Sequence, residues 1–186
     1  MVKIAVLVGS TRRDSINRKL AQALVKLGEG RFDPIWVRID DLPLFGQDHE
    51  HEPTPAVTRM KEEIRSADGL LFVTPEHNRS IPAALKNAID WATRPYGTSV
   101  LTGKPSAVAG TAQGPISAAI AQVHLKNILL TLTRAVLGQP ECYLRYTDEL
   151  FADDGSIPNE GTRKFLAGFV DRFVDFVAAL ARPLSP

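Results

Sequence analysis

Polar side chains that suit a phosphate group follow the first apolar segment of the chain. Ser10, Thr11 and Ser15 carry hydroxyls, Arg12 and Arg13 are cations and Asn17 carries an amide. A helix is predicted to begin near Ser15, and the free N–H groups of a helix start, together with an arginine, favour binding of a phosphate dianion. In the alternative interpretation Ser15 only caps the helix and the two arginines are solvated. Both interpretations stay open on these residues alone.

A second polar segment, Pro75 to Ser80, follows a short buried strand and is bracketed by prolines. Pro82 suits the first turn of a helix predicted from about Ile81, because its missing N–H is one that would be unpaired there. Asn78 and Ser80 can donate hydrogen bonds to the edge of a planar heterocycle. A polar loop that follows a buried strand and is held by a proline at each end is typical of a binding site.

Two side chains of this segment are ionisable. Glu76 can orient the loop by accepting backbone N–H bonds, or it can cap a helix. His77 is interpreted as packing beside a ligand or at a subunit contact, rather than as an acid or base. We therefore assign no catalytic side chain here.

A third segment, Gly110 to Ser117, follows another predicted strand. Gly110 and Gly114 have no side chains and Gln113 lies between them, so their N–H groups allow a close approach to a ring edge. An ordinary turn between a strand and a helix would explain the same residues. This segment indicates a binding site only if it lies beside the first two polar segments in the folded chain.

The elements that must position these segments are apolar strands alternating with helices of crossover length. This alternation predicts an α/β fold: a doubly wound, five-stranded parallel sheet of order 2-1-3-4-5, with helices on both faces. Each polar segment follows the carboxyl end of a strand, where such sheets bind ligands. The expected strands are 2–8, 33–39, 69–73, 104–111 and 136–144, and the expected helices are 15–27, 55–66, 81–91, 116–132 and 159–181.

Composition limits the classes of function. The 186 residues fit one domain, 1–186, and a net charge of +1 with interleaved acids and bases disfavours nucleic acid and a membrane surface as partners. The N-terminus enters a strand with no signal-peptide profile, so we expect a cytoplasmic protein. The lone Cys142 is expected to be a buried packing residue.

Several competing motifs are missing or incomplete. The segment Gly97 to Pro105 has the wrong spacing for a phosphate-binding P-loop, and Gly28 and Gly30 lie at a helix end rather than after a strand. No Gly-x-Ser-x-Gly elbow is present, which weakens a hydrolase interpretation. The run Asp48 to Glu52 could bind a metal only with further support, so no metal site is predicted.

Taken together, the motifs resemble those of the NADPH-dependent FMN reductase family, which includes flavodoxin-like quinone and chromate reductases. The run 9–17 is similar to the family's Gly-Ser-x-Arg-x-x-Ser-x-Asn phosphate loop, and 42–45 to the loop that follows. The run 75–91 resembles its Pro-Glu-Tyr-Asn-x-Ser-x-Pro-x-x-Leu-Lys-Asn-Ala-Ile-Asp-Trp signature. His77 in place of Tyr, Ala83 in place of Gly, and Ser117-Ala118 in place of Gly-Gly depart from the family and bear on substrate preference.

The resemblance implies an FMN site in which 10–17 hold the phosphate, 75–80 line the isoalloxazine and 110–114 approach its pyrimidine side. Within 10–17 the implied phosphate ligands are Ser10, Arg12, Ser15 and Asn17. The full set of implied cofactor-binding residues is Ser10, Arg12, Ser15, Ile16, Asn17, Pro75, Glu76, His77, Asn78, Arg79, Ser80, Gly110, Gln113 and Gly114.

The implied activity is hydride transfer from NAD(P)H through bound FMN to a quinone, free flavin, azo compound or metal oxyanion such as chromate. A homodimer or homotetramer is also implied, with Arg94 to Gly97 and the helix after Pro115 as candidate contacts. Two alternatives remain: a flavodoxin-type electron carrier, and a flavin-free regulatory or phosphometabolite-binding domain on the same fold. The balanced charge argues against the carrier, which would be strongly acidic.

Overall fold

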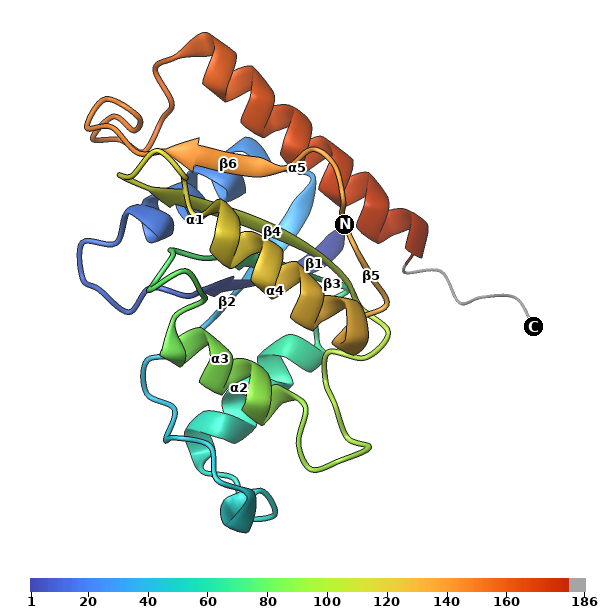
Figure 1. The fold of residues 1–186 in the computed structure, drawn as a ribbon. Helices are drawn as coiled ribbons and strands as arrows, with labels where there is room; N and C mark the ends of the chain where they lie inside the picture. Colours follow the sequence, from blue (N-terminus) through green and yellow to red (C-terminus); the bar gives the residue numbers. More distant parts are fainter. Residues whose placement is uncertain (181–186) are drawn as a thin grey trace.

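The computed structural model describes residues 1–180, which form a parallel sheet between two layers of helices (Figure 1). The strand order is β2-β1-β3-β4-β5, with β6 also paired to β4, so the predicted order and doubly wound fold are confirmed. The strands are β1 (Val2–Val8), β2 (Phe32–Val37), β3 (Gly69–Val73), β4 (Pro105–Ala112), β5 (Ala135–Val136) and β6 (Cys142–Arg145).

Both faces of the sheet are buried, which explains why its strands are almost continuously apolar. Along β1, Ile4 and Val6 pack with α1 and α5, whereas Ala5 and Leu7 pack with α2, α3 and α4 on the other face. The helices are α1 (Ile16–Leu27), α2 (Pro55–Arg65), α3 (Ala83–Ala92), α4 (Ala119–Leu132) and α5 (Glu160–Leu180), with a short 3-10 turn, η1, at Gln47–His49.

The predicted fifth strand, 136–144, is split into β5 and β6. Both pair with β4, and the residues between them include Pro140, which has no N–H to donate to a ladder. Cys142 on β6 is fully buried, as expected for a packing residue. This burial raises the pKa of its thiol to about 12.

The last helix covers the face formed by β1 and β4. Its buried residues include Leu166, Phe169 and Phe173, whereas Phe165, near the start of the helix, is exposed. Ala181, the predicted end of the helix, lies outside the described residues. Within residues 1–180, no helix combines the length and the apolar character needed to cross a membrane.

The carboxyl ends of β1, β3 and β4 lie side by side at one edge of the sheet. The N–H of Gly9 donates to the carbonyl of Val73 at 2.8 Å, and the N–H of Thr74 donates to that of Ala109 at 2.9 Å. The segments that follow these strands are therefore brought together, as predicted from the strand order.

Candidate functional site

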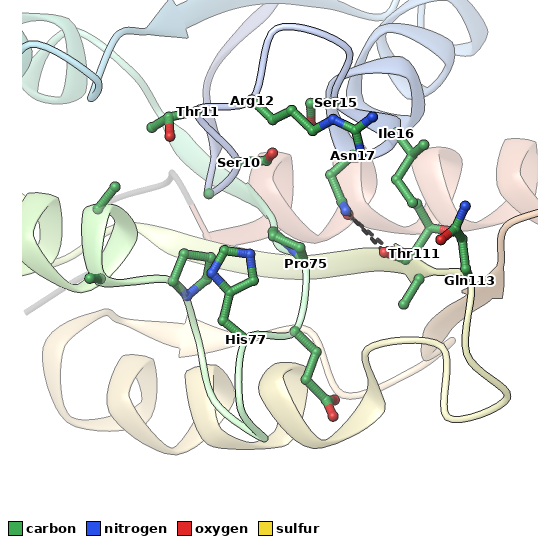
Figure 2. A pocket seen from close by; sticks show the side chains of 16 residues that line it. Ser10, Thr11, Arg12, Ser15, Ile16, Asn17, Pro75, His77, Thr111 and Gln113 are labelled. Carbon is green, nitrogen blue, oxygen red and sulfur yellow. Dashed lines mark hydrogen bonds between the residues drawn. The ribbon is translucent and has the colours of Figure 1, made fainter.

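A cavity of about 600 Å³ lies at this edge, between the segments that follow β1, β3 and β4. In Figure 2 the loop that carries Ser10 and Arg12 lies on one side of the cavity, and Pro75 and His77 lie on the other. The wall is formed by Gly9, Ser10, Thr11, Arg12, Ser15, Ile16, Asn17, Pro75, Glu76, His77, Pro82, Ala83, Ala84, Thr111, Ala112 and Gln113.

The start of α1 forms one end of the cavity. Ser15 is the N-cap, and its hydroxyl oxygen accepts the N–H of Arg18 at 3.1 Å. The backbone N–H groups of Ile16 and Asn17 have no acceptor among the described residues. Ser15 therefore caps the helix, as in the alternative interpretation, while the free N–H groups of Ile16 and Asn17, which line the cavity, are still able to bind an anion.

Within residues 1–180, Arg12 lacks the carboxylate partner that several other arginines have. Arg38, Arg59, Arg79 and Arg94 each pair with a carboxylate, whereas no carboxylate within residues 1–180 pairs with Arg12. Its exposed side chain lies beside Ser15 in Figure 2. A guanidinium left free beside a helix start is suited to a phosphate.

Asn17 has a structural role that its sequence position did not indicate. Its side-chain Nδ2 donates to the Thr111 carbonyl at 2.9 Å, and its Oδ1 accepts the Thr111 N–H at 3.0 Å. The residue is only 1% exposed, so this amide ties the start of α1 to the end of β4. The backbone N–H and the second Nδ2 hydrogen of Asn17 have no acceptor among residues 1–180, so the predicted phosphate contact stays a prediction.

The segment Pro75 to Ser80 is a tight hairpin. His77 and Ser80 exchange two backbone hydrogen bonds of 2.9 Å, while Asn78 and Arg79 have φ of 50° and 66°. Positive φ at both central residues defines a type I′ turn. Pro75, Glu76 and His77 line the cavity, whereas the three residues 78–80 at the tip do not.

The tip of the hairpin faces a second cavity of about 450 Å³, between α3 and α4. Asn78 and Ser80 line it, and His77 lines both cavities. The Ser80 hydroxyl lies 2.8 Å from Nδ1 of His124 on α4. Ser80 is therefore engaged with α4, and its role as a donor to a heterocycle stays a prediction.

Glu76 resolves the choice that its sequence position left open. Its Oε2 accepts the N–H groups of Ile120 and Ala121 at 3.1 and 3.2 Å, and its Oε1 accepts from Arg79 at 3.2 Å. The side chain thus caps a helix, and that helix is α4 rather than the adjacent α3. Only 11% of it is exposed.

Gly110 lies inside β4 rather than in the loop after it. A Cβ at this position would stand 2.4 Å from the Thr74 carbonyl oxygen and 2.9 Å from Nε2 of Gln122. Its lack of a side chain therefore serves the close packing of β3, β4 and α4. Gly110 and Gly114 are both absent from the cavity wall, and Gln113 is part of it.

Sequence reasoning missed part of the wall. Thr111, the expected end of the fourth strand, and Ala112 were not among the expected cofactor-binding residues, yet both lie at the end of β4 and line the cavity. Ala83 and Ala84 also line it, and their N–H groups, at the start of α3, have no acceptor among residues 1–180. The signal was Pro82, which marked a helix start directly after the hairpin.

The acidic run near η1 has a structural role. Glu50 is nearly buried, and its Oε2 lies 2.7 Å from Nε of Arg94. Among residues 1–180, no group of three His, Cys, Asp or Glu side chains is placed to hold a metal ion.

The cavity fits FMN. Its volume lies within the range of about 300–1,000 Å³ common for small-molecule sites. The start of α1 and Arg12 supply donors for a phosphate at one side, and Pro75, His77 and Ala112 provide small or flat surfaces for a ring at the other. The fold and the cavity together define a flavodoxin-like protein suited to a phosphorylated planar cofactor.

Comparisons with known proteins agree with this class. The family model described as NADPH-dependent FMN reductase matches residues 2–148. The chain is 46% identical to a 2-hydroxy-1,4-benzoquinone reductase of Burkholderia sp over 176 residues, covering 95% of this chain and 96% of the relative. It is 34% identical to a quinone reductase of Escherichia coli K12 over 180 residues, covering 95% of each.

Among solved structures, the flavoenzyme NAD(P)H:(acceptor) oxidoreductase FerB from Paracoccus denitrificans superposes with a TM-score of 0.92 at 47% identity. The match covers 96% of this chain and 98% of FerB. The chain belongs to the NADPH-dependent FMN reductase family. It is an oxidoreductase that uses FMN and takes electrons from NAD(P)H.

Proposed function

We propose that this enzyme reduces quinones with electrons from NAD(P)H. The observation that carries the proposal is one cavity at which free N–H groups of two helix starts, an arginine with no carboxylate partner among residues 1–180 and a rigid hairpin meet. Relatives named as quinone reductases, at 46% and 34% identity, support a quinone as acceptor. Free flavin, azo compounds and chromate are the competing acceptors.

In this proposal the start of α1 binds the FMN phosphate through Ser10, Arg12 and the N–H groups of Ile16 and Asn17. Pro75, Glu76 and His77 lie along the ring, with Gln113 at its far edge. Bound FMN supplies the hydride acceptor and donor for both half-reactions. The chain orients the cofactor, excludes water from one face of it, and offers backbone N–H groups to negative charge.

Stopped-flow mixing of the FMN-loaded protein with NADPH or NADH, followed by a panel of acceptors, tests the proposal. We expect bleaching of the flavin absorbance by the nicotinamide and its fastest return with a quinone. If NADPH and NADH do not bleach the flavin unless a partner protein is added, the electron-carrier alternative is supported instead. Faster return with chromate or free flavin than with any quinone would reject the quinone as the preferred acceptor.

The proposal includes a homo-oligomer. Ile116, Ile120, Val123 and Leu130 are exposed apolar residues on or just before α4, and Tyr96 is 91% exposed. Apolar side chains gathered along one helix are typical of a subunit contact.

Light scattering after gel filtration tests the contact. Val123→Lys should yield a monomer. Phe165→Lys, a similarly exposed apolar position on α5, is the control and should leave the oligomer intact. A monomeric native protein would contradict this part of the proposal.

Two further predictions remain part of the proposal. A single domain over 1–186 is supported by two core clusters that share one sheet. A cytoplasmic location is supported by the use of NAD(P)H, which is an intracellular electron donor.

A further inference from the structure

Four residues other than glycine have positive φ within residues 1–180, and they form two adjacent pairs. Asn78 and Arg79, at φ of 50° and 66°, form the tip of the hairpin. Ser117 and Ala118, at 56° and 59°, precede α4. Left-handed backbone at residues with a Cβ is costly and persists only where the surroundings hold it.

One carboxylate connects these two pairs. Glu76 Oε1 accepts from the guanidinium of Arg79, and Oε2 accepts the N–H groups of Ile120 and Ala121, just beyond Ala118. The N-cap residue of α4 is Ala118, whose side chain cannot accept a hydrogen bond. Glu76 therefore supplies, from another segment, the cap that α4 lacks.

A second contact lies one turn further along α4. The Ser80 hydroxyl and Nδ1 of His124 are 2.8 Å apart. The hairpin is thus bonded to α4 at both of its ends, through Glu76 and through Ser80. These contacts hold the hairpin, whose residues 75–77 line the main cavity, against α4, whose start follows the lining residue Gln113 by a few residues.

We propose that Glu76 is a positioning residue that sets the width of the ring-binding side of the cavity by holding the hairpin to the strained start of α4. The inference rests on the proposed FMN site. A carboxylate suits this role because it accepts several N–H bonds at once, and because negative charge is favoured at a helix N-terminus.

Two substitutions of Glu76 distinguish its hydrogen bonds to α4 from its other contacts. Glu76→Ala removes every contact, whereas Glu76→Gln keeps one oxygen that can accept the N–H groups of α4. Glu141→Ala is the matched control, since Glu141 also bonds to α4, through Lys126 at 3.1 Å, but is absent from the cavity wall.

The first measurement is amide hydrogen exchange on the FMN-free protein, so it does not depend on the proposed function. Glu76→Ala should speed exchange at Ile120 and Ala121 about tenfold, the factor expected for loss of about one net hydrogen bond to a charged group. Glu76→Gln and Glu141→Ala should change it less than threefold. Unchanged exchange in Glu76→Ala would overturn the inference, whatever the protein binds.

The second measurement is FMN affinity, from quenching of flavin fluorescence, with circular dichroism of the bound flavin as the readout of ring geometry. Glu76→Ala should weaken binding about tenfold and alter the flavin bands, and Glu76→Gln should recover most of both. Equal losses in the two variants, or native affinity and bands in Glu76→Ala, would contradict positioning by these hydrogen bonds. Failure of the native protein to bind FMN would reject the proposed function alone.

A third variant tests the strain directly and stays informative if Glu76→Ala folds poorly. Ser117→Gly places a glycine where φ is positive. Because glycine adopts this backbone conformation without strain, the start of α4 should depend less on the hydrogen bonds from Glu76. The exchange and affinity losses of Glu76→Gln and Glu76→Ala should be smaller in the Ser117→Gly background. Losses of equal size in both backgrounds would show that Glu76 does not hold the strained segment.

Discussion

At the α1 side of the cavity, Arg12 and the N–H groups of Ile16 and Asn17 have no partner among the described residues, whereas at the hairpin Glu76 and Ser80 are bonded to α4. The loop after β1 and the hairpin after β3 both consist mostly of polar residues. The first keeps its donors for a ligand, and the second uses its side chains to hold backbone in place. We infer that the first supplies affinity for the phosphate and the second supplies the shape that receives the ring.

The three helix starts near the cavity show the same contrast. The starts of α1 and α3 present free N–H groups to it, and the start of α4 is closed by Glu76. An anion is favoured only at the open starts, because the α4 donors are already satisfied by a carboxylate.

The largest effect on stability should come from Gly110→Ala. This variant tests whether Gly110 serves the packing of the sheet rather than the binding of a ligand. Its Cβ would collide with the Thr74 carbonyl, so we expect a loss of about 3 kcal/mol in the free energy of unfolding. Gly114→Ala is the control, because nothing lies within 4 Å of a Cβ there, and it should leave stability unchanged. Urea unfolding of both variants measures this, and equal stabilities would refute the structural role.

Arg12→Ala should weaken FMN binding by about 1.5–3 kcal/mol, the magnitude for a hydrogen bond to a charged group. Arg13→Ala removes the neighbouring exposed cation, which does not line the cavity, and should have little effect. Fluorescence titration compares the two. If both variants lose the same affinity, general charge rather than a specific contact holds the phosphate.

Asn17→Ala tests the link between the two sides. It leaves the Thr111 N–H and carbonyl unpaired in a buried position, so we expect a loss of about 2 kcal/mol in the free energy of unfolding. Asn17→Asp keeps only the acceptor and should cost a similar amount. Native stability in both, measured by thermal unfolding, would contradict the proposed link.

Much of this arrangement was predictable from the sequence. Apolar strands alternating with helices predicted a doubly wound parallel sheet, and segments that follow the carboxyl ends of its strands were therefore expected at one edge, as observed. Which polar atoms are free was not predictable. Asn17 and Glu76 bond to Thr111 and Ile120, which lie 94 and 44 residues away in the sequence. Patterns of neighbouring residues therefore could not predict those contacts.

The smallest effect is expected for Ser15→Ala. Loss of the N-cap bond to Arg18 should cost about 1 kcal/mol in stability, and loss of the hydroxyl should weaken phosphate binding by a similar amount. Ser15→Gly, which costs only a few tenths of a kcal/mol at an N-cap, separates the two contributions. A stability loss with native FMN affinity would leave Ser15 as a cap alone.

The central claim is that the α1 side binds the phosphate, and the direct measurement compares FMN with riboflavin, which has the same ring without that group. Titration of the FMN-free protein should show FMN binding tighter than riboflavin by about 100-fold, equivalent to about 2.7 kcal/mol. Arg12→Ala should remove much of this difference while leaving riboflavin binding unchanged. Equal affinities of the native protein for FMN and riboflavin would contradict the account.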